Sequence, residues 1–86
     1  MTWRLVWTRP AAKDLKRLDP PVAYQIRERM IRLAETGQGD ITRLAGVLLP
    51  AWRLRVGDWR VIFEYKHEHA VIEVLHVLGR DKAYKR

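Results

Sequence analysis

The feature that most constrains the fold is a change in hydrophobic periodicity near residue 51. From there on, apolar and polar residues alternate in three runs, 52–56, 59–66 and 70–78. Gly57-Asp58 and the residues HEH at 67–69 interrupt the alternation. Because successive side chains of a strand point to opposite faces, a period of two predicts strands with one buried face. Three such runs joined by short turns predict an antiparallel meander.

The first half of the chain is mostly helical in its spacing. Only residues 3–7 (WRLVW) alternate, which predicts one N-terminal strand. Thr8 is suited to cap a helix, and Asp19 with the two prolines after it ends that helix and starts a second. The second helix has an apolar stripe of Val22, Ile26, Met30 and Leu33. Gly37 is a suitable C-cap, and residues 37–50 are expected to form a loop.

This order of elements predicts an α+β fold. A strand and a helical hairpin precede the three-stranded meander, so the helices should pack on one face of a twisted sheet and leave the other open. With 86 residues, we expect a single domain over residues 1–86. No stretch approaches the roughly 20 apolar residues of a membrane span, and the N-terminus lacks a signal-peptide pattern. We therefore expect a cytoplasmic protein that does not contact membranes.

The chain carries a large positive charge for its size. Its 17 Lys and Arg against 10 Asp and Glu give a formal net charge of +7 and a pI of about 10.4. Such an excess favours polyanionic partners such as nucleic acid or an acidic protein segment. Cysteine is absent, which excludes thiol catalysis and disulfides. A metal would depend on His67, His69 and His76 with scattered carboxylates, and we expect no metal and no cofactor.

Basic residues interrupt the apolar pattern of the meander on one side only. Residues two apart in a strand share a face, and a hairpin aligns like faces. The open face should therefore gather Arg53, Arg55, Arg60 and Lys66, with Arg4 joining from the first strand. Glu64 is the only acid predicted among them. An ordinary solvated sheet surface is the alternative, but arginine offers a planar fork that suits phosphate and stacks on bases.

Other candidate residues lie outside this set. Arg80 and Tyr84 follow the last predicted strand and would reach the arginines if the C-terminal residues fold back over the open face. Alternation places His76 with Ile72 and Val74, so a hydrogen-bonded interior histidine is expected. The tryptophans are in the apolar phase of their strands, which favours core positions over stacking on bases: Trp3, Trp7, Trp52 and Trp59.

The whole chain resembles the RelE/ParE superfamily of toxins from bacterial type II toxin–antitoxin systems. The resemblance is carried, in order, by RLVWTRPAAKDLKRL, ITRLAG, WRLRVGDWRVIFE and VLHVLGRDKAYKR. Toxins of the RelE type are ribosome-dependent endoribonucleases that cut mRNA in the decoding site, whereas ParE types act on DNA gyrase. Arg60, Arg80 and Tyr84 match positions that the RelE-type nucleases use. The resemblance therefore implies the RelE-like branch.

The resemblance also implies roles for these residues. Arg60 would bind the scissile phosphate, Arg80 would stabilise the transition state, and Tyr84 would stack on a base or orient the attacking 2′-hydroxyl. The expected RNA-binding residues are Arg53, Arg55, Lys66 and Lys82. The chain departs from the best-known RelE enzyme, which has lysines at the positions of Arg53 and Arg55. Arginine is a poor general base, so the base stays open among Tyr84, Lys66, His76 and a ribosomal group.

The resemblance implies partners as well. An acidic or amphipathic antitoxin segment would cover the basic face in a toxin–antitoxin hetero-oligomer, and the ribosome with its mRNA would be the target. Cleavage would use the 2′-hydroxyl of the RNA itself, without a metal ion. Two alternatives stay open: a ParE-like toxin that binds gyrase without nuclease activity, and a basic RNA-binding domain without activity.

Overall fold

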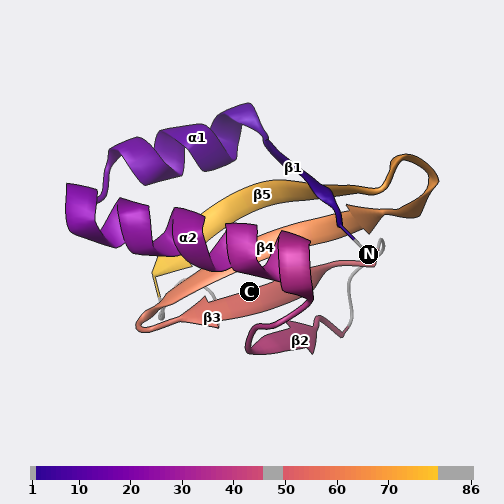
Figure 1. Cartoon of the computed structure of the whole chain (residues 1–86). Coiled ribbons are helices and arrows are strands. Elements are labelled where there is room, and N and C mark those ends of the chain that lie inside the picture. Colours follow the sequence, from indigo (N-terminus) through magenta and orange to yellow (C-terminus); the bar gives the residue numbers. More distant parts are fainter. Residues whose placement is uncertain (1, 46–49, 80–86) are drawn as a thin grey trace.

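The computed structural model describes residues 2–45 and 50–79, which form two α-helices and five strands (Figure 1). In chain order the elements are β1 (Arg4–Trp7), α1 (Arg9–Lys16), α2 (Pro20–Thr36), β2 (Ile41–Arg43), β3 (Trp52–Val56), β4 (Trp59–Lys66), the short 3-10 helix η1 (His67–His69) and β5 (Val71–Gly79). The predicted α+β fold is confirmed. Thr8 caps α1 by accepting a hydrogen bond from the backbone N–H of Ala11, and Gly37 ends α2 with a left-handed φ of 79°.

The five strands form one mixed sheet in the order β1-β5-β4-β3-β2. The predicted meander is β3, β4 and β5, which pair antiparallel, and β1 adds parallel to β5. The expectation of a loop over residues 37–50 was wrong for Ile41–Arg43, which pair antiparallel with β3. Two features explain this strand. It provides hydrogen-bond partners for the outer backbone groups of β3, which would otherwise be unpaired. Its apolar residue Ile41 also packs against the core.

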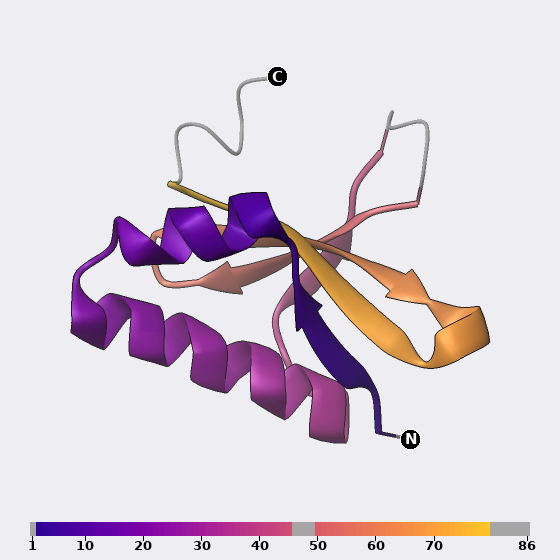
Figure 2. The same cartoon turned by 90° about the horizontal axis from the view of Figure 1, so that it is seen from above.

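One hydrophobic core lies between the helices and one face of the sheet. In Figure 1, α2 lies in front of the strands, and α1 lies beside β5; Figure 2 gives the view from above. Both helices contribute buried residues to the same cluster as the sheet, including Leu15 of α1, Ile26 and Met30 of α2, and Phe63 of β4. The four tryptophans pack against this cluster, as predicted. The opposite face of the sheet is left without a covering helix among the described residues.

The helix α1 also completes the hydrogen bonding of β5 beyond the end of β1. The Thr8 hydroxyl donates to the carbonyl oxygen of Val74 at 2.7 Å, and the Asp14 carboxylate accepts the backbone N–H of Val77 at 2.8 Å. These side chains therefore replace the strand neighbour that β5 lacks there.

A β-bulge in β5 changes which residues face the core. Ile62 of β4 pairs with His76 and Phe63 pairs with Val74, so Leu75 is an extra residue without a partner on β4. Beyond the bulge the alternation is reversed, and Val77 is buried instead of His76. The expectation of an interior His76 was therefore wrong: its side chain is 52% exposed.

Candidate nucleic-acid interface

The open face of the sheet brings together the three arginines of the β3–β4 hairpin. Arg55 lies directly opposite Arg60 in the strand register, and Arg53 lies opposite Ile62. Since paired residues of neighbouring strands share a face, all three side chains emerge on the side away from the core, as predicted. Like charges placed directly opposite one another destabilise a hairpin. The register thus concentrates positive charge where packing alone does not require it.

Arg60 is held more rigidly than the sequence suggested. The residue is only 4% exposed, and Nη1 donates to the carbonyl oxygens of Gly57 at 3.1 Å and of Trp59 at 3.0 Å. The guanidinium thus ties the turn between β3 and β4 to the strand that follows it. Because so little of the side chain reaches solvent, RNA would have to uncover Arg60 in order to touch it.

Arg55 is the exposed member of the set. Its guanidinium lies 4.0 Å from the carboxylate of Asp40, and both side chains are more than half exposed. Such a pair is worth little in water, so Arg55 can exchange it for a phosphate at small cost. The backbone N–H of Arg55 also donates to the carbonyl oxygen of Asp40 at 3.0 Å, which fixes β3 against the start of β2.

Lys66 lies at the other end of the open face, six residues along β4 from Arg60. Its ammonium is 2.9 Å from Glu64 and 3.8 Å from Glu73, and these carboxylates, Glu64 foremost, raise the pKa of Lys66. The prediction that Glu64 is the only acid on this face was therefore wrong, since Glu73 joins it. The raised pKa keeps Lys66 protonated, and an ammonium group cannot accept a proton. Lys66 is therefore poorly suited to act as a general base.

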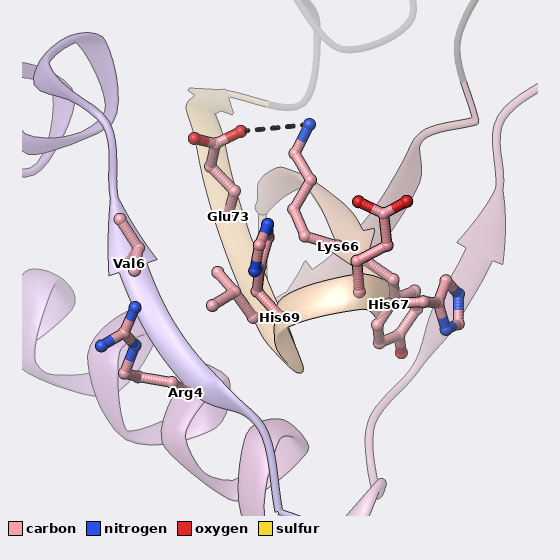
Figure 3. Close-up of a pocket in the computed structure, with 9 residues that line it drawn as sticks. Arg4, Val6, Lys66, His67, His69 and Glu73 are labelled. Carbon is pink, nitrogen blue, oxygen red and sulfur yellow. Dashed lines mark ion pairs between the residues drawn. The ribbon is translucent and has the colours of Figure 1, made fainter.

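An open pocket of about 590 Å³ lies at this end of the sheet, between β1, β5 and η1. Figure 3 shows Lys66 and Glu73 pointing toward each other, while Arg4 lies on β1. Its charged lining residues are Arg4, Lys66, Glu68 and Glu73, two of each sign. Because the formal charges cancel, this pocket is a poorer anion site than the opposite end of the open face, where Arg53, Arg55 and Arg60 lie. That end is called the arginine end.

Tyr65 lies on the helix-covered side, within a group of aromatic rings. Its ring centroid is 4.9 Å from that of Trp3, 5.4 Å from that of Phe63 and 5.7 Å from that of Trp52. Burial raises the pKa of Tyr65, so its phenol stays neutral at physiological pH. This group anchors the residues before β1 to the sheet, and Tyr65 also lines the pocket at the Lys66 end.

Three predicted site residues, Arg80, Lys82 and Tyr84, lie outside the described residues. Within residues 2–45 and 50–79, no three histidine or acidic side chains gather as they would around a metal ion. Over the same part of the chain, neither helix is long and apolar enough to cross a membrane.

Sequence reasoning missed one arrangement at the arginine end, the contact between Asp14 of α1 and His76 of β5. Oδ2 of Asp14 lies 3.4 Å from Nδ1 of His76. The position of His76 depends on the bulge at Leu75, and a bulge is not visible in an alternation of apolar residues. The acid Glu73, in contrast, was visible, because it alternates with Ile72 and Val74.

Comparison with solved structures places this fold among RelE toxins. The toxin of the archaeal RelE–RelB complex from Pyrococcus horikoshii OT3 is 27% identical, with a TM-score of 0.77 over 93% of this chain and 97% of that one. RelBE2 from Mycobacterium tuberculosis matches at 22% identity and a TM-score of 0.82, over 93% and 100% of the chains. Isolated E. coli RelE matches at 17% identity and a TM-score of 0.74, over 91% and 84%.

The comparison of sequences gives the family. No curated protein matches this chain. The family model described as "ParE toxin of type II toxin-antitoxin system, parDE" matches residues 5–84, which is nearly the whole chain. With its RelE-like fold, this protein is therefore a toxin of a type II toxin–antitoxin system and belongs to the ParE toxin family of the RelE/ParE superfamily.

Proposed function

We propose that this toxin is an endoribonuclease that cleaves mRNA on the ribosome and so inhibits translation. The observation that carries the proposal is the pairing of Arg55 with Arg60 on the open face, with Arg53 on the same side. Three guanidiniums on neighbouring strands give an anion-binding face, which an acidic protein segment could also occupy. A sugar-phosphate backbone presents a row of anionic oxygens that such forks bind.

The proposed reaction needs no group beyond the RNA and the protein. The 2′-oxygen loses its proton and attacks the adjacent phosphorus, and the bond from phosphorus to the 5′-oxygen breaks. The products are a 2′,3′-cyclic phosphate and a 5′-hydroxyl end, once the 5′-oxygen has gained a proton. Negative charge accumulates on the phosphoryl oxygens in the transition state, so fixed cations that face them lower the barrier.

The described arginines suit different parts of this task. Arg55 is exposed and paired with a surface carboxylate, so it and Arg53 would clamp the backbone beside the scissile bond. Arg60 is bonded to the turn through Nη1, which fixes the direction of its guanidinium before substrate arrives. Once RNA has uncovered this buried side chain, its fixed charge would suit the scissile phosphate. In this proposal Arg80 stabilises the transition state, Tyr84 orients the nucleotide, and Lys82 contacts the flanking RNA.

The proposal includes an antitoxin partner. Several solved relatives are toxin–antitoxin complexes, among them the archaeal RelE–RelB complex. An antitoxin segment rich in acidic residues would neutralise the net charge of +7 and cover the arginine end of the open face. Toxin and antitoxin would then form a hetero-oligomer in which RNA cannot bind.

The test is a cleavage assay on ribosomes programmed with a defined mRNA, with the new 5′ ends mapped by primer extension. We expect cuts in the decoding site. Arg80→Ala should abolish the cuts, whereas Arg27→Ala on the exposed side of α2 should not change them. Intact mRNA with the wild-type toxin, or cuts that survive Arg80→Ala, would contradict the proposal.

A second function has one observation in its favour. The family model that matches is that of ParE toxins, which makes DNA gyrase an alternative target. The same preparation should therefore be added to a gyrase supercoiling assay. Inhibition of gyrase with intact ribosomal mRNA would select this alternative and would leave the arginines to bind a protein surface.

A further inference from the structure

The bulge in β5 places the imidazole of His76 at the arginine end of the open face. Because Leu75 is the extra residue, His76 pairs with Ile62, and Leu78 pairs with Arg60. His76 and Arg60 are thus diagonal neighbours on one face of two adjacent strands. Residues so placed lie roughly 7–8 Å apart, a span that one phosphodiester can bridge. The side chain of His76 is 52% exposed, so a substrate can reach it.

A carboxylate of the neighbouring helix lies beside this imidazole. Oδ2 of Asp14 lies 3.4 Å from Nδ1 of His76, and the same oxygen accepts the backbone N–H of Val77 at 2.8 Å. The hydrogen bond to Val77 fixes the carboxylate, whose side chain is only 20% exposed. A carboxylate that faces Nδ1 favours the tautomer with the proton on that nitrogen. The other ring nitrogen, Nε2, is then a proton acceptor.

The other groups on the described open face are less suited to accept a proton. The arginines stay protonated at any physiological pH. Lys66 is held between two carboxylates that raise its pKa, and it lies at the far end of β4. Glu64 and Glu73 are its ion-pair partners. A histidine changes its charge between about pH 5 and pH 8, which suits proton transfer at neutral pH.

We propose that His76 is the general base of the cleavage reaction and that Asp14 is its positioning residue. This inference rests on the proposed nuclease function and adds the proton acceptor that the arginines cannot provide. Nε2 takes the proton of the 2′-hydroxyl as the 2′-oxygen bonds to phosphorus. The bond to the 5′-oxygen breaks, and that oxygen takes a proton from water. The imidazolium then returns its proton to solvent.

The experiment measures single-turnover cleavage on programmed ribosomes between about pH 5 and pH 9. His76→Ala should lower the rate by about 10²–10⁴-fold and remove the decline of the rate at acid pH. His76→Asn, which keeps a polar side chain of similar shape, should behave alike. His69→Ala, which removes an exposed histidine of η1, is the matched control and should leave the rate and its pH profile unchanged.

Asp14→Asn separates positioning from structural support. An asparagine can still accept the N–H of Val77, so the fold should survive, as a thermal melt will show. Without the carboxylate beside Nδ1, the imidazole is no longer held in one orientation, so the cleavage rate should fall, and Asp14→Glu should restore part of it. The charged neighbours of His76 to be considered in the profile are Asp14 of α1 and the diagonal residues Arg60 and Glu64 of β4.

The outcomes distinguish this inference from the function on which it rests. If wild-type toxin leaves ribosomal mRNA intact, both the nuclease and its base are overturned. If wild type cleaves and both His76 variants keep its rate and pH profile, only the general base is overturned. Rescue of the His76→Ala rate by added imidazole, without rescue of an Arg80→Ala variant, would support the assignment.

Discussion

At the scale of single residues, the core depends on a small number of fully buried side chains. Phe63 is 0% exposed and lies in the middle of β4, opposite both helices. It packs edge-to-face against Tyr65, with ring centroids 5.4 Å apart. A domain of this size has few such anchors, so the loss of one is a large fraction of its stability.

Phe63→Ala should lower the free energy of unfolding by about 3–5 kcal/mol, because it removes a buried ring and leaves a cavity. Urea unfolding followed by circular dichroism measures this loss. Tyr24→Ala is the matched control, since Tyr24 is an aromatic residue that is 60% exposed on α2. That variant should stay within about 0.5 kcal/mol of wild type. Equal losses in both variants would contradict the assigned core.

Lys66 gives a pH dependence of known sign. Its folded-state pKa is raised above the 10.5 of an unperturbed lysine, so its pairing with Glu64 and Glu73 stabilises the fold fully below about pH 10.5. This contribution is lost as the pH rises through the folded-state pKa. The difference in unfolding free energy between wild type and Lys66→Met should therefore shrink as the pH rises above about 10.5. In a Glu64→Gln background the difference should already be smaller below that pH.

At the scale of elements, α1 does two tasks that its sequence only partly reveals. The capping role of Thr8 could be predicted, because threonine before an early proline is typical of a helix start. Its second role could not: the hydroxyl also donates to Val74 in β5, 66 residues away. Long-range hydrogen bonds depend on which strand lies beside the helix, and local spacing does not specify that neighbour.

Thr8→Val should therefore cost about 1–2 kcal/mol of stability, because the isosteric side chain loses the cap and the bond to β5 together. Thr8→Ser keeps the hydroxyl and should lose clearly less stability than Thr8→Val. Both values can be taken from urea unfolding under the same conditions. A Thr8→Ser variant as unstable as Thr8→Val would show that the methyl group, and not the hydroxyl, holds α1 in place.

For the strands as well, local sequence patterns predicted some features, whereas features that depend on pairing between distant residues were missed. Period-two alternation was enough to predict β1, β3, β4 and most of β5, and also the shared face of Arg53 and Arg55. It failed at two positions. The strand β2 has only three residues, too few for a period to be recognised. The bulge at Leu75 shifts the phase of β5 without any glycine to signal it, so the outward turn of His76 was missed.

At the scale of the whole molecule, the net charge of +7 acts on any RNA before specific contacts form. Each phosphate that a cation neutralises releases a counterion, so affinity falls as salt rises. The arginine end of the open face should contribute most to this dependence. The exposed side of α2 carries basic residues as well, but they are interleaved with Glu28 and Glu35.

Arg55→Ala should therefore reduce the slope of log affinity against log salt by about 0.7 for single-stranded RNA, which corresponds to one phosphate contact. Fluorescence anisotropy with a labelled oligonucleotide at several salt concentrations gives the slope. Arg27→Ala removes the same charge from α2 and should leave the slope nearly unchanged. Equal reductions in the two variants would indicate binding by net charge alone, without a defined RNA-binding face.

The central claim is that guanidiniums of the open face stabilise the transition state of RNA cleavage. The most direct measurement is the single-turnover cleavage rate of Arg60→Ala on programmed ribosomes, at a temperature where its thermal melt shows a folded protein. We predict a loss of about 10²–10³-fold relative to wild type, with Arg27→Ala unchanged. A folded Arg60→Ala variant that cleaves at the wild-type rate would contradict the claim.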